Sequence, residues 1–434
     1  MADYRSGAWR HRVAALLIGA GLAWSAGAAA APVAPAVTVA PAATDKPTPH
    51  LNAMPDPVAL PAADPALAVL AVLGRKLFFD QNLSEPRGTS CAACHQPGKA
   101  FSGNHGSALG VALGSKPGSM GTRNTPSLLY LRYTPARFFY QDDDASLPTP
   151  FGGFFADGRA DTLAEQALGP LLHPLEMNNK NARQIAGKLQ RGHGAEMRAR
   201  FGATIFAKPE QATAAAARAL EAFLRSNEMS PFSSRYDDYI RGKASLGQAE
   251  LKGLKLFKDA DKGNCASCHK FNETSANPAR SLFTDFSYDA IAVPRNNRIP
   301  ANHRPGHYDR GLCDTAVKLK WQDPEQWCAY FKTPSLRNVA VRDNYMHNGV
   351  FDSLRDVVSF YATRATQPRD WYKSGIKFDD VPEKYRGNVN VNAVPYNRRE
   401  GSKPALNEEE IDDIVAFLKT LTDAPYAARA ANRK

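Results

Sequence analysis

The 434-residue sequence lacks the patterns that mark two large classes of protein. After the N-terminal segment, no stretch reaches the roughly 18 consecutive apolar residues that a membrane-spanning helix requires. The formal charge of +11 is not accompanied by a Lys/Arg cluster with interleaved aromatic residues, which is typical of a nucleic-acid surface. We therefore expect no membrane span after signal cleavage and no nucleic-acid partner. The excess of positive side chains should keep the surface solvated and can attract an acidic partner protein.

Cysteine is scarce, and four of the six cysteines lie in two Cys-x-x-Cys-His motifs. The motif residues are Cys91, Cys94, His95, Cys265, Cys268 and His269. This spacing is the attachment signature of c-type haem, in which two thiols bond the porphyrin and the adjacent imidazole reaches the iron. A zinc site would need two further ligands close by, and a thioredoxin-like redox pair needs no His. The sequence therefore predicts two covalently bound haem c groups, each with a His ligand to its iron.

The N-terminus has the layout of a secretory signal peptide over residues 1–31, with arginines, an apolar run and then small residues. An uncleaved membrane anchor is the main alternative. Export would place the protein in the periplasm, where haem c is attached and where Cys313 and Cys328 can form a disulfide. The alternative for these two cysteines is a pair of free buried thiols; a bridge would contribute about 3 kcal/mol.

The fold class that we predict is mainly α, with two cytochrome c-like haem domains facing each other and long loops. Residues 32–63 are rich in Ala and Pro and should form a linker. We place the N-terminal domain at residues 64–240, with the peroxide-site haem, and the C-terminal domain at residues 241–434, with the electron-transfer haem. The first expected helix begins after Asp64, which should act as its cap. Further helices are expected over residues 162–172, 182–190, 209–225 and 246–258, and in a stretch after Asn407. Residues 97–126 should form a long loop.

Three further segments resemble one family, the bacterial di-haem cytochrome c peroxidases, and in particular their MauG-type branch. They are Arg123-Asn124-Thr125-Pro126-Ser127-Leu128, the stretch from Asp157-Gly158-Arg159 to Pro174-Leu175-Glu176-Met177, and Phe331-Lys332-Thr333-Pro334-Ser335-Leu336-Arg337-Asn338 with Tyr345-Met346-His347-Asn348-Gly349. The resemblance covers roughly residues 64–423, except for much of an insertion between His269 and Phe331.

The resemblance implies that the first haem is a peroxide site with Gln166 and Glu176 over its open face. Splitting an O–O bond requires a group that takes a proton from one oxygen and returns it to the other, and a carboxylate in a dry pocket suits this task. We expect Glu176 to be this acid and base, Gln166 to orient the peroxide, and Pro170 to shape the pocket. From its residue type alone, Glu176 could equally be an ordinary surface carboxylate.

The resemblance also implies the remaining iron ligands. Some family members place a His on the first iron, but the matching position here is Lys116, and His105 does not match. We expect an open first iron, with Met120 as a rival ligand. On the second iron the matching position is Tyr361, with Met346 as its rival, and a phenolate favours oxidised iron whereas Met raises the potential.

Two further family features concern the contact between the domains. A calcium ion is expected on the side chain of Asn124 and the backbone carbonyls of Arg342 and Asn344, which are oxygen ligands that suit Ca²⁺. The family's usual Trp between the haems is absent: Ala156 stands at its position, and there is no Trp between Trp24 and Trp321. The usual charge relay is therefore in doubt.

Three functions follow. The first is reduction of hydrogen peroxide by a periplasmic di-haem peroxidase that receives electrons from a small cytochrome c or cupredoxin. The second is a MauG-like enzyme that oxidises Trp or Tyr of a partner protein. The third, a di-haem electron carrier or redox sensor without turnover, has no use for Gln166 and Glu176.

Overall fold

The computed structural model describes residues 65–141 and 148–432. The predicted signal peptide (1–31), the linker (32–63) and the Asp64 cap lie outside these residues. For convenience, residues 65–240 are called the N-terminal half and residues 241–432 the C-terminal half. No helix in the described ranges combines the length and the apolar character that crossing a bilayer would require.

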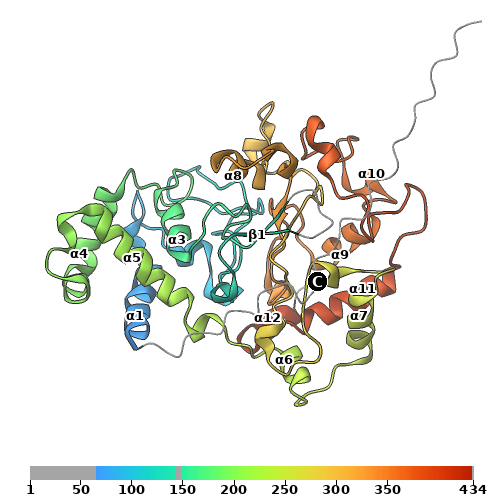
Figure 1. Cartoon of the computed structure of the whole chain (residues 1–434), viewed down its shortest axis with the longest axis horizontal. Helices are drawn as coiled ribbons and strands as arrows, with labels where there is room; N and C mark the ends of the chain where they lie inside the picture. The colour runs from blue at the N-terminus through green and yellow to red at the C-terminus, as the bar shows by residue number, and fades with distance from the viewer. Residues whose placement is uncertain (1–64, 142–147, 433–434) are drawn as a thin grey trace, which may run out of the picture. The chain divides into compact units, whose positions relative to one another are not determined.

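Helices supply most of the regular structure (Figure 1). The N-terminal half contains α1 (Pro65–Phe79), α2 (Cys91–Cys94), α3 (Leu163–Leu172), α4 (Ala182–Phe201), α5 (Pro209–Leu224) and α6 (Arg235–Ile240). The C-terminal half contains α7 (Gln248–Lys258), α8 (Leu312–Lys318), α9 (Leu354–Thr363), α10 (Pro368–Trp371), α11 (Glu408–Lys419) and α12 (Ala427–Ala431). The expected helices are thus present, and residues 97–126 form the expected long loop, with one short 3₁₀ turn at Pro97–Lys99.

Two small antiparallel sheets complete the regular structure. In the first, β1 (Phe138–Tyr140) pairs with β2 (Thr149–Phe151), with Phe138 opposite Phe151. In the second, β3 (Tyr288–Asp289) pairs with β4 (Phe331–Lys332), with Tyr288 opposite Lys332. This second pairing joins residues 288–289, inside the insertion, to its end.

One predicted helix end was wrong. The helix expected over residues 182–190 continues to Phe201, past Gly192 and Gly194. The apolar face that begins with Ile185 and Leu189 resumes at Met197, and all three side chains are fully buried. Packing of this face therefore outweighs the low helix propensity of the two glycines.

The same helix crossing occurs once in each half. α1 packs on α5, and α7 packs on α11. A Cβ atom on Gly74 would lie 1.8 Å from the carbonyl oxygen of Ala219, and a Cβ atom on Gly253 would lie 1.9 Å from that of Asp413. Only glycine permits backbones to approach so closely. Each crossing therefore fixes the helix that leads into a haem motif.

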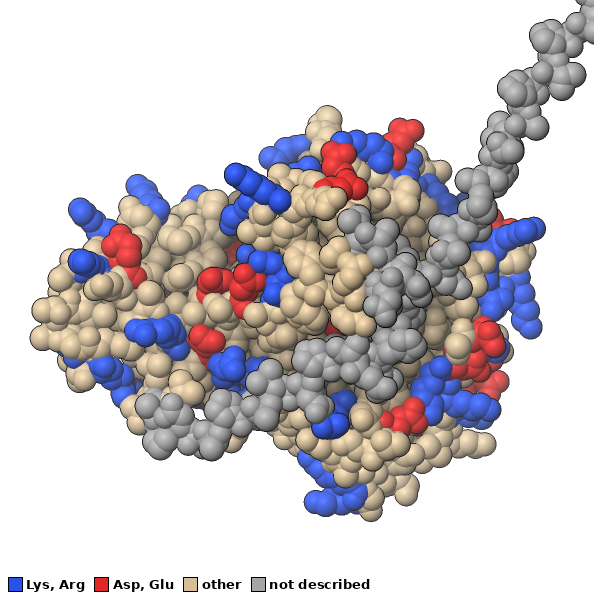
Figure 2. Space-filling model, viewed as in Figure 1, with Lys and Arg blue, Asp and Glu red and all other residues tan. Residues whose placement is uncertain are grey.

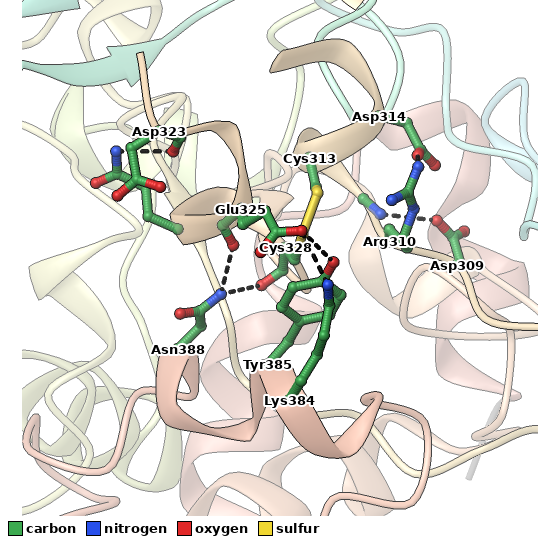
Figure 3. Close-up of a disulfide and its surroundings, with 12 residues drawn as sticks. Asp309, Arg310, Cys313, Asp314, Asp323, Glu325, Cys328, Lys384, Tyr385 and Asn388 are labelled. Atoms are coloured by element: carbon green, nitrogen blue, oxygen red, sulfur yellow. Dashed lines mark hydrogen bonds and ion pairs between the residues drawn. A yellow bond between two sulfur atoms is a disulfide. The ribbon is translucent and has the colours of Figure 1, made fainter. Parts of the chain in front are cut away.

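The disulfide between Cys313 and Cys328 lies in a second apolar cluster, which the insertion shares with residues that follow it. Both cysteines are fully buried, and Trp327 and Tyr385 belong to the same cluster. Asn388 donates from its side-chain amide to the carbonyl of Cys328 at 3.2 Å (Figure 3). The disulfide alternative is therefore the one that the structure contains.

On the face shown in Figure 2, Lys and Arg side chains are spread around the molecule among Asp and Glu and do not gather in one patch.

Candidate active site

The two motif histidines are held in the same way. Nδ1 of His95 lies 3.1 Å from the carbonyl oxygens of both Phe101 and Pro126. Nδ1 of His269 lies 2.9 Å from the carbonyl oxygen of Phe283. A hydrogen bond from Nδ1–H to a carbonyl fixes the ring and leaves Nε2 free as a metal ligand.

Burial keeps both imidazoles neutral. It lowers the pKa of His95 and of His269 to about 4, although the carbonyl contacts act in the opposite direction. A neutral imidazole is the form that binds iron. The local geometry and the protonation state therefore fit haem ligation at both positions.

Both Cys-x-x-Cys-His motifs line a single cavity of about 700 Å³. α2 carries Cys91 and Cys94, and a 3₁₀ turn carries Cys265. Burial raises the pKa of all four motif thiols to about 12. Leucines line this cavity near both motifs, namely Leu128, Leu220, Leu224, Leu336, Leu406 and Leu418. Apolar walls with two thiols and an imidazole at each end fit two covalently attached haems.

The three residues expected around the peroxide site line this cavity as well. α3 supplies Gln166, which is 8% exposed, and Pro170, which lies inside the helix. The chain turns after α3 so that the N–H of Met177 donates to the carbonyl of Pro170 at 3.1 Å. This turn places Glu176 beside the same cavity as Gln166 and Pro170.

Glu176 is in an environment that favours its neutral form. Burial raises its pKa above the usual range, while His173 and Arg159 act in the opposite direction. Oε1 of Glu176 lies 3.6 Å from Nδ1 of His173, which also lines the cavity. His173 was not predicted from the sequence, although its position after a helix and three residues before Glu176 was a usable signal.

Neither the rival ligand Met120 nor the two positions considered for the family's His ligand to the first iron lies at the cavity. Among the residues described, His105, Lys116 and Met120 are all absent from the cavity lining. Nδ1 of His105 instead contacts the carbonyl of Leu113 at 2.9 Å. The arrangement of these three residues is compatible with an open first iron.

Tyr361 projects from α9 to the cavity near the second motif. Its ring stacks with Tyr396 at a centroid distance of 6.0 Å, and the guanidinium of Arg364 lies 3.8 Å from the Tyr396 ring centroid. Burial raises the pKa of the Tyr361 phenol, whereas Arg364 favours the phenolate. Met346 also lines the cavity, so both candidate ligands of the second iron, Tyr361 and Met346, lie at the same cavity.

Ala156 stands at the position where the family usually has Trp, and a backbone hydrogen bond joins it to the C-terminal half. The N–H of Lys332 donates to the carbonyl of Ala156 at 2.8 Å. Aromatic side chains nevertheless line the cavity nearby, because Phe155 does so and Phe331 stacks on His347 at a centroid distance of 3.7 Å. Burial lowers the pKa of the Lys332 ammonium to about 8.

The predicted calcium ligands come together, but their hydrogen bonds do not fit a Ca²⁺ site. The side-chain amide of Asn124 donates to the carbonyl of Asn344 at 2.9 Å and to that of Met346 at 3.2 Å. Nε of Arg342 donates to the same Asn344 carbonyl at 3.3 Å. Both lone pairs of this oxygen therefore have N–H donors, and a positive charge already lies beside it.

Comparison with known proteins agrees with this arrangement. A family model described as "Di-haem cytochrome c peroxidase" matches residues 69–245. The methylamine utilization protein MauG of Paracoccus denitrificans is 37% identical, over 84% of this chain and 91% of that protein. The cytochrome c551 peroxidase of Nitrosomonas europaea is 26% identical, over 83% and 82%. The crystal structure of the diheme peroxidase BthA from Burkholderia thailandensis superimposes with a TM-score of 0.82 at 55% identity, over 86% and 90% of the two chains.

Proposed function

Because the chain belongs to the di-haem cytochrome c peroxidase family and is a haem oxidoreductase, we propose that it reduces hydrogen peroxide to water. The overall step is H₂O₂ + 2 e⁻ + 2 H⁺ → 2 H₂O, with electrons from a small redox protein such as a cytochrome c or a cupredoxin. The observation that carries the proposal is the convergence of Gln166, Pro170 and Glu176 on the cavity that the first haem motif lines.

A haem held by Cys91, Cys94 and His95 would supply the iron and the electrons for cleavage of the O–O bond. Glu176 takes the proton from the oxygen that approaches the iron and gives it to the oxygen that leaves. A raised pKa suits this exchange, because the group must both accept and release a proton near neutral pH. Gln166 orients the peroxide by hydrogen bonding, and Pro170 fixes the turn that holds Glu176.

Tyr361 is the proposed second ligand of the second iron. A phenolate is a hard anionic donor that stabilises oxidised iron, so this haem would store an oxidising equivalent and would accept electrons from the donor. Burial raises the pKa of this phenol and Arg364 beside Tyr396 acts in the opposite direction, so the bound iron would supply most of the stabilisation of a phenolate. Phe155, Phe331 and His347 are the aromatic groups at the cavity that take the place of the missing Trp.

A second candidate function is the oxidation of Trp or Tyr in a partner protein. It is favoured by the 37% identity to MauG over most of both chains. Peroxide would be the oxidant in this reaction too, so Gln166 and Glu176 serve both functions equally.

The test uses the purified di-haem protein with peroxide. Rapid peroxide consumption in the presence of reduced cytochrome c or cupredoxin supports the peroxidase. Covalent oxidation of a candidate partner protein, detected by mass spectrometry, supports the second function. A protein that keeps both haems but does neither would be the electron carrier or sensor, and the proposal would be wrong.

We also propose that the protein acts in the periplasm after cleavage of residues 1–31. The apolar run and the small residues near Ala28 to Ala31 support this location. N-terminal sequencing of the protein from its native host tests it, because an intact Met1 would contradict cleavage.

A further inference from the structure

Arg342 links the two halves of the molecule close to the first haem motif. Its Nη2 donates to the carbonyl of Thr125 in the N-terminal half at 3.0 Å. Its Nε donates to the carbonyl of Asn344 in the C-terminal half at 3.3 Å. One guanidinium therefore binds two backbone oxygens that come from segments more than 200 residues apart.

Asn124 completes the same junction. Its backbone N–H donates to the carbonyl of His347 at 2.7 Å, and its side chain binds the carbonyls of Asn344 and Met346. The side chain of Asn344 is also engaged, because it accepts from Asn104 at 2.9 Å and donates to Asp352. The groups at this junction thus satisfy one another with N–H donors and oxygen acceptors.

The charge of Arg342 has no carboxylate partner in the described part of the chain. No Asp or Glu oxygen there lies within 4.0 Å of it, although Asp343 acts on it from farther away. Two other arginines that join the halves have carboxylate partners, since Arg123 contacts Asp309 and Arg337 contacts Asp237. A half-buried guanidinium that donates to two carbonyl oxygens is in the position of a bound cation.

We propose that the guanidinium of Arg342 takes the place of a calcium ion between the two halves, so that this protein is held together at this junction without calcium. A Ca²⁺ ion binds carbonyl oxygens at 2.3–2.6 Å with six to eight oxygen ligands in all. At Asn344, both lone pairs of the carbonyl are already used, and the adjacent positive charge repels a divalent ion. The planar fork of arginine can instead bind two separate carbonyls at once.

This arrangement makes Arg342 a positioning residue for the first haem ligand. It holds the carbonyl of Thr125, and the next residue, Pro126, presents the carbonyl that Nδ1 of His95 contacts. Arg342 and His95 line the same cavity, so the guanidinium charge lies near the first iron's ligand as well as holding the segment that orients it.

The first measurement is the calcium content of the purified di-haem protein, before and after treatment with EGTA. We expect far less than one calcium per chain and no change in thermal midpoint when EGTA or CaCl₂ is added. One firmly bound calcium per chain, or a midpoint that falls in EGTA, would overturn the proposal.

The second measurement uses Arg342→Thr, with Arg355→Thr as the control because Arg355 forms an exposed ion pair with Asp412. We expect Arg342→Thr to have a lower midpoint in EGTA, and a lower reduction potential of the first haem because a cation near His95 is lost. CaCl₂ should restore both, whereas the control should not respond. If Arg342→Thr in EGTA keeps the wild-type midpoint and potential, the guanidinium holds nothing together and the proposal fails.

Arg342→Lys separates charge from geometry and serves if Arg342→Thr does not fold. A lysine keeps the charge but cannot bind both carbonyls in a fork. We expect a near wild-type potential of the first haem with a lower midpoint. A midpoint equal to that of the wild type would show that the fork is unnecessary and would contradict the bridging role.

Discussion

Arg123 and Asp309 form a two-point ion pair, with Nε 2.6 Å from Oδ2 and Nη2 2.7 Å from Oδ1. The pair joins the loop before Asn124 to the insertion, and 186 residues separate its members. Burial alone would raise the pKa of Asp309, but the Arg123 guanidinium holds it well below the usual range. The pair therefore stabilises the fold while the carboxylate is ionised.

Asp309→Asn should lower the free energy of unfolding at pH 7 by about 1.5–3 kcal/mol, because Arg123 keeps only its contact with Asp157. A depressed pKa contributes stability above the unfolded-state value, and this contribution is lost as pH falls toward the folded-state value. The difference between wild type and variant should therefore shrink below about pH 4. Thermal unfolding at several pH values measures this, with the exposed Asp314→Asn as control. A constant difference down to pH 2 would be inconsistent with the pair.

Glu176→Gln should retain both haems and slow peroxide turnover by on the order of 10²–10⁴-fold, because the amide cannot transfer the proton. In the wild type, kcat/KM should fall as pH decreases through the raised pKa of Glu176, above the range of an ordinary Glu. The variant should lack this acid limb. Glu165→Gln, in the first turn of α3 and therefore ahead of the turn that carries Glu176, is the control. Unchanged turnover in Glu176→Gln would remove this residue from the mechanism.

Tyr361→Met should raise the reduction potential of the second haem, since Met replaces an anionic ligand. The wild type should show no Met-to-iron charge-transfer band, and the variant should show one. Absorption spectroscopy and a redox titration measure both properties. Tyr396→Phe keeps Tyr361 and should leave the spectrum unchanged. A Met-to-iron band in the wild type would identify Met346 as the ligand instead.

Gly74→Ala should destabilise the N-terminal half by about 3 kcal/mol or more, because its Cβ would lie 1.8 Å from the carbonyl oxygen of Ala219. Gly187→Ala in α4 is the matched control, since a Cβ there meets only the end of the Arg191 side chain at 3.6 Å. It should be neutral or stabilising by up to about 1 kcal/mol. Thermal midpoints compare the two, and an equal effect would mean that the helix crossing tolerates a methyl group.

Much of the fold could be predicted from local patterns in the sequence. The Cys-x-x-Cys-His spacing predicted both haem sites, and the apolar periodicity predicted the helices that flank them. The extension of α4 past Gly192 was missed because it depends on how Met197 packs, which is not a local property.

The candidate site was predictable only in part. Gln166, Pro170 and Glu176 came from the resemblance, and the structure places them at one cavity. Lys332 and Arg342 were not predicted as charged groups at the junction, because their partners lie far away in sequence. Arg342 was predicted only as a backbone carbonyl ligand of calcium, and the role of its side chain, which donates to the carbonyl of Thr125, was missed.

The cavity that both motifs line has a consequence for how the protein matures. Without the porphyrins, the apolar side chains around this space of about 700 Å³ would lack packing partners, which weakens the folded state. Filled with water, the space would wet leucines such as Leu220 and Leu418 from both halves. The chain should therefore reach its final shape only as the two porphyrins are attached. The attachment machinery must act on a chain that is still open, and loss of one motif should impair loading at the other.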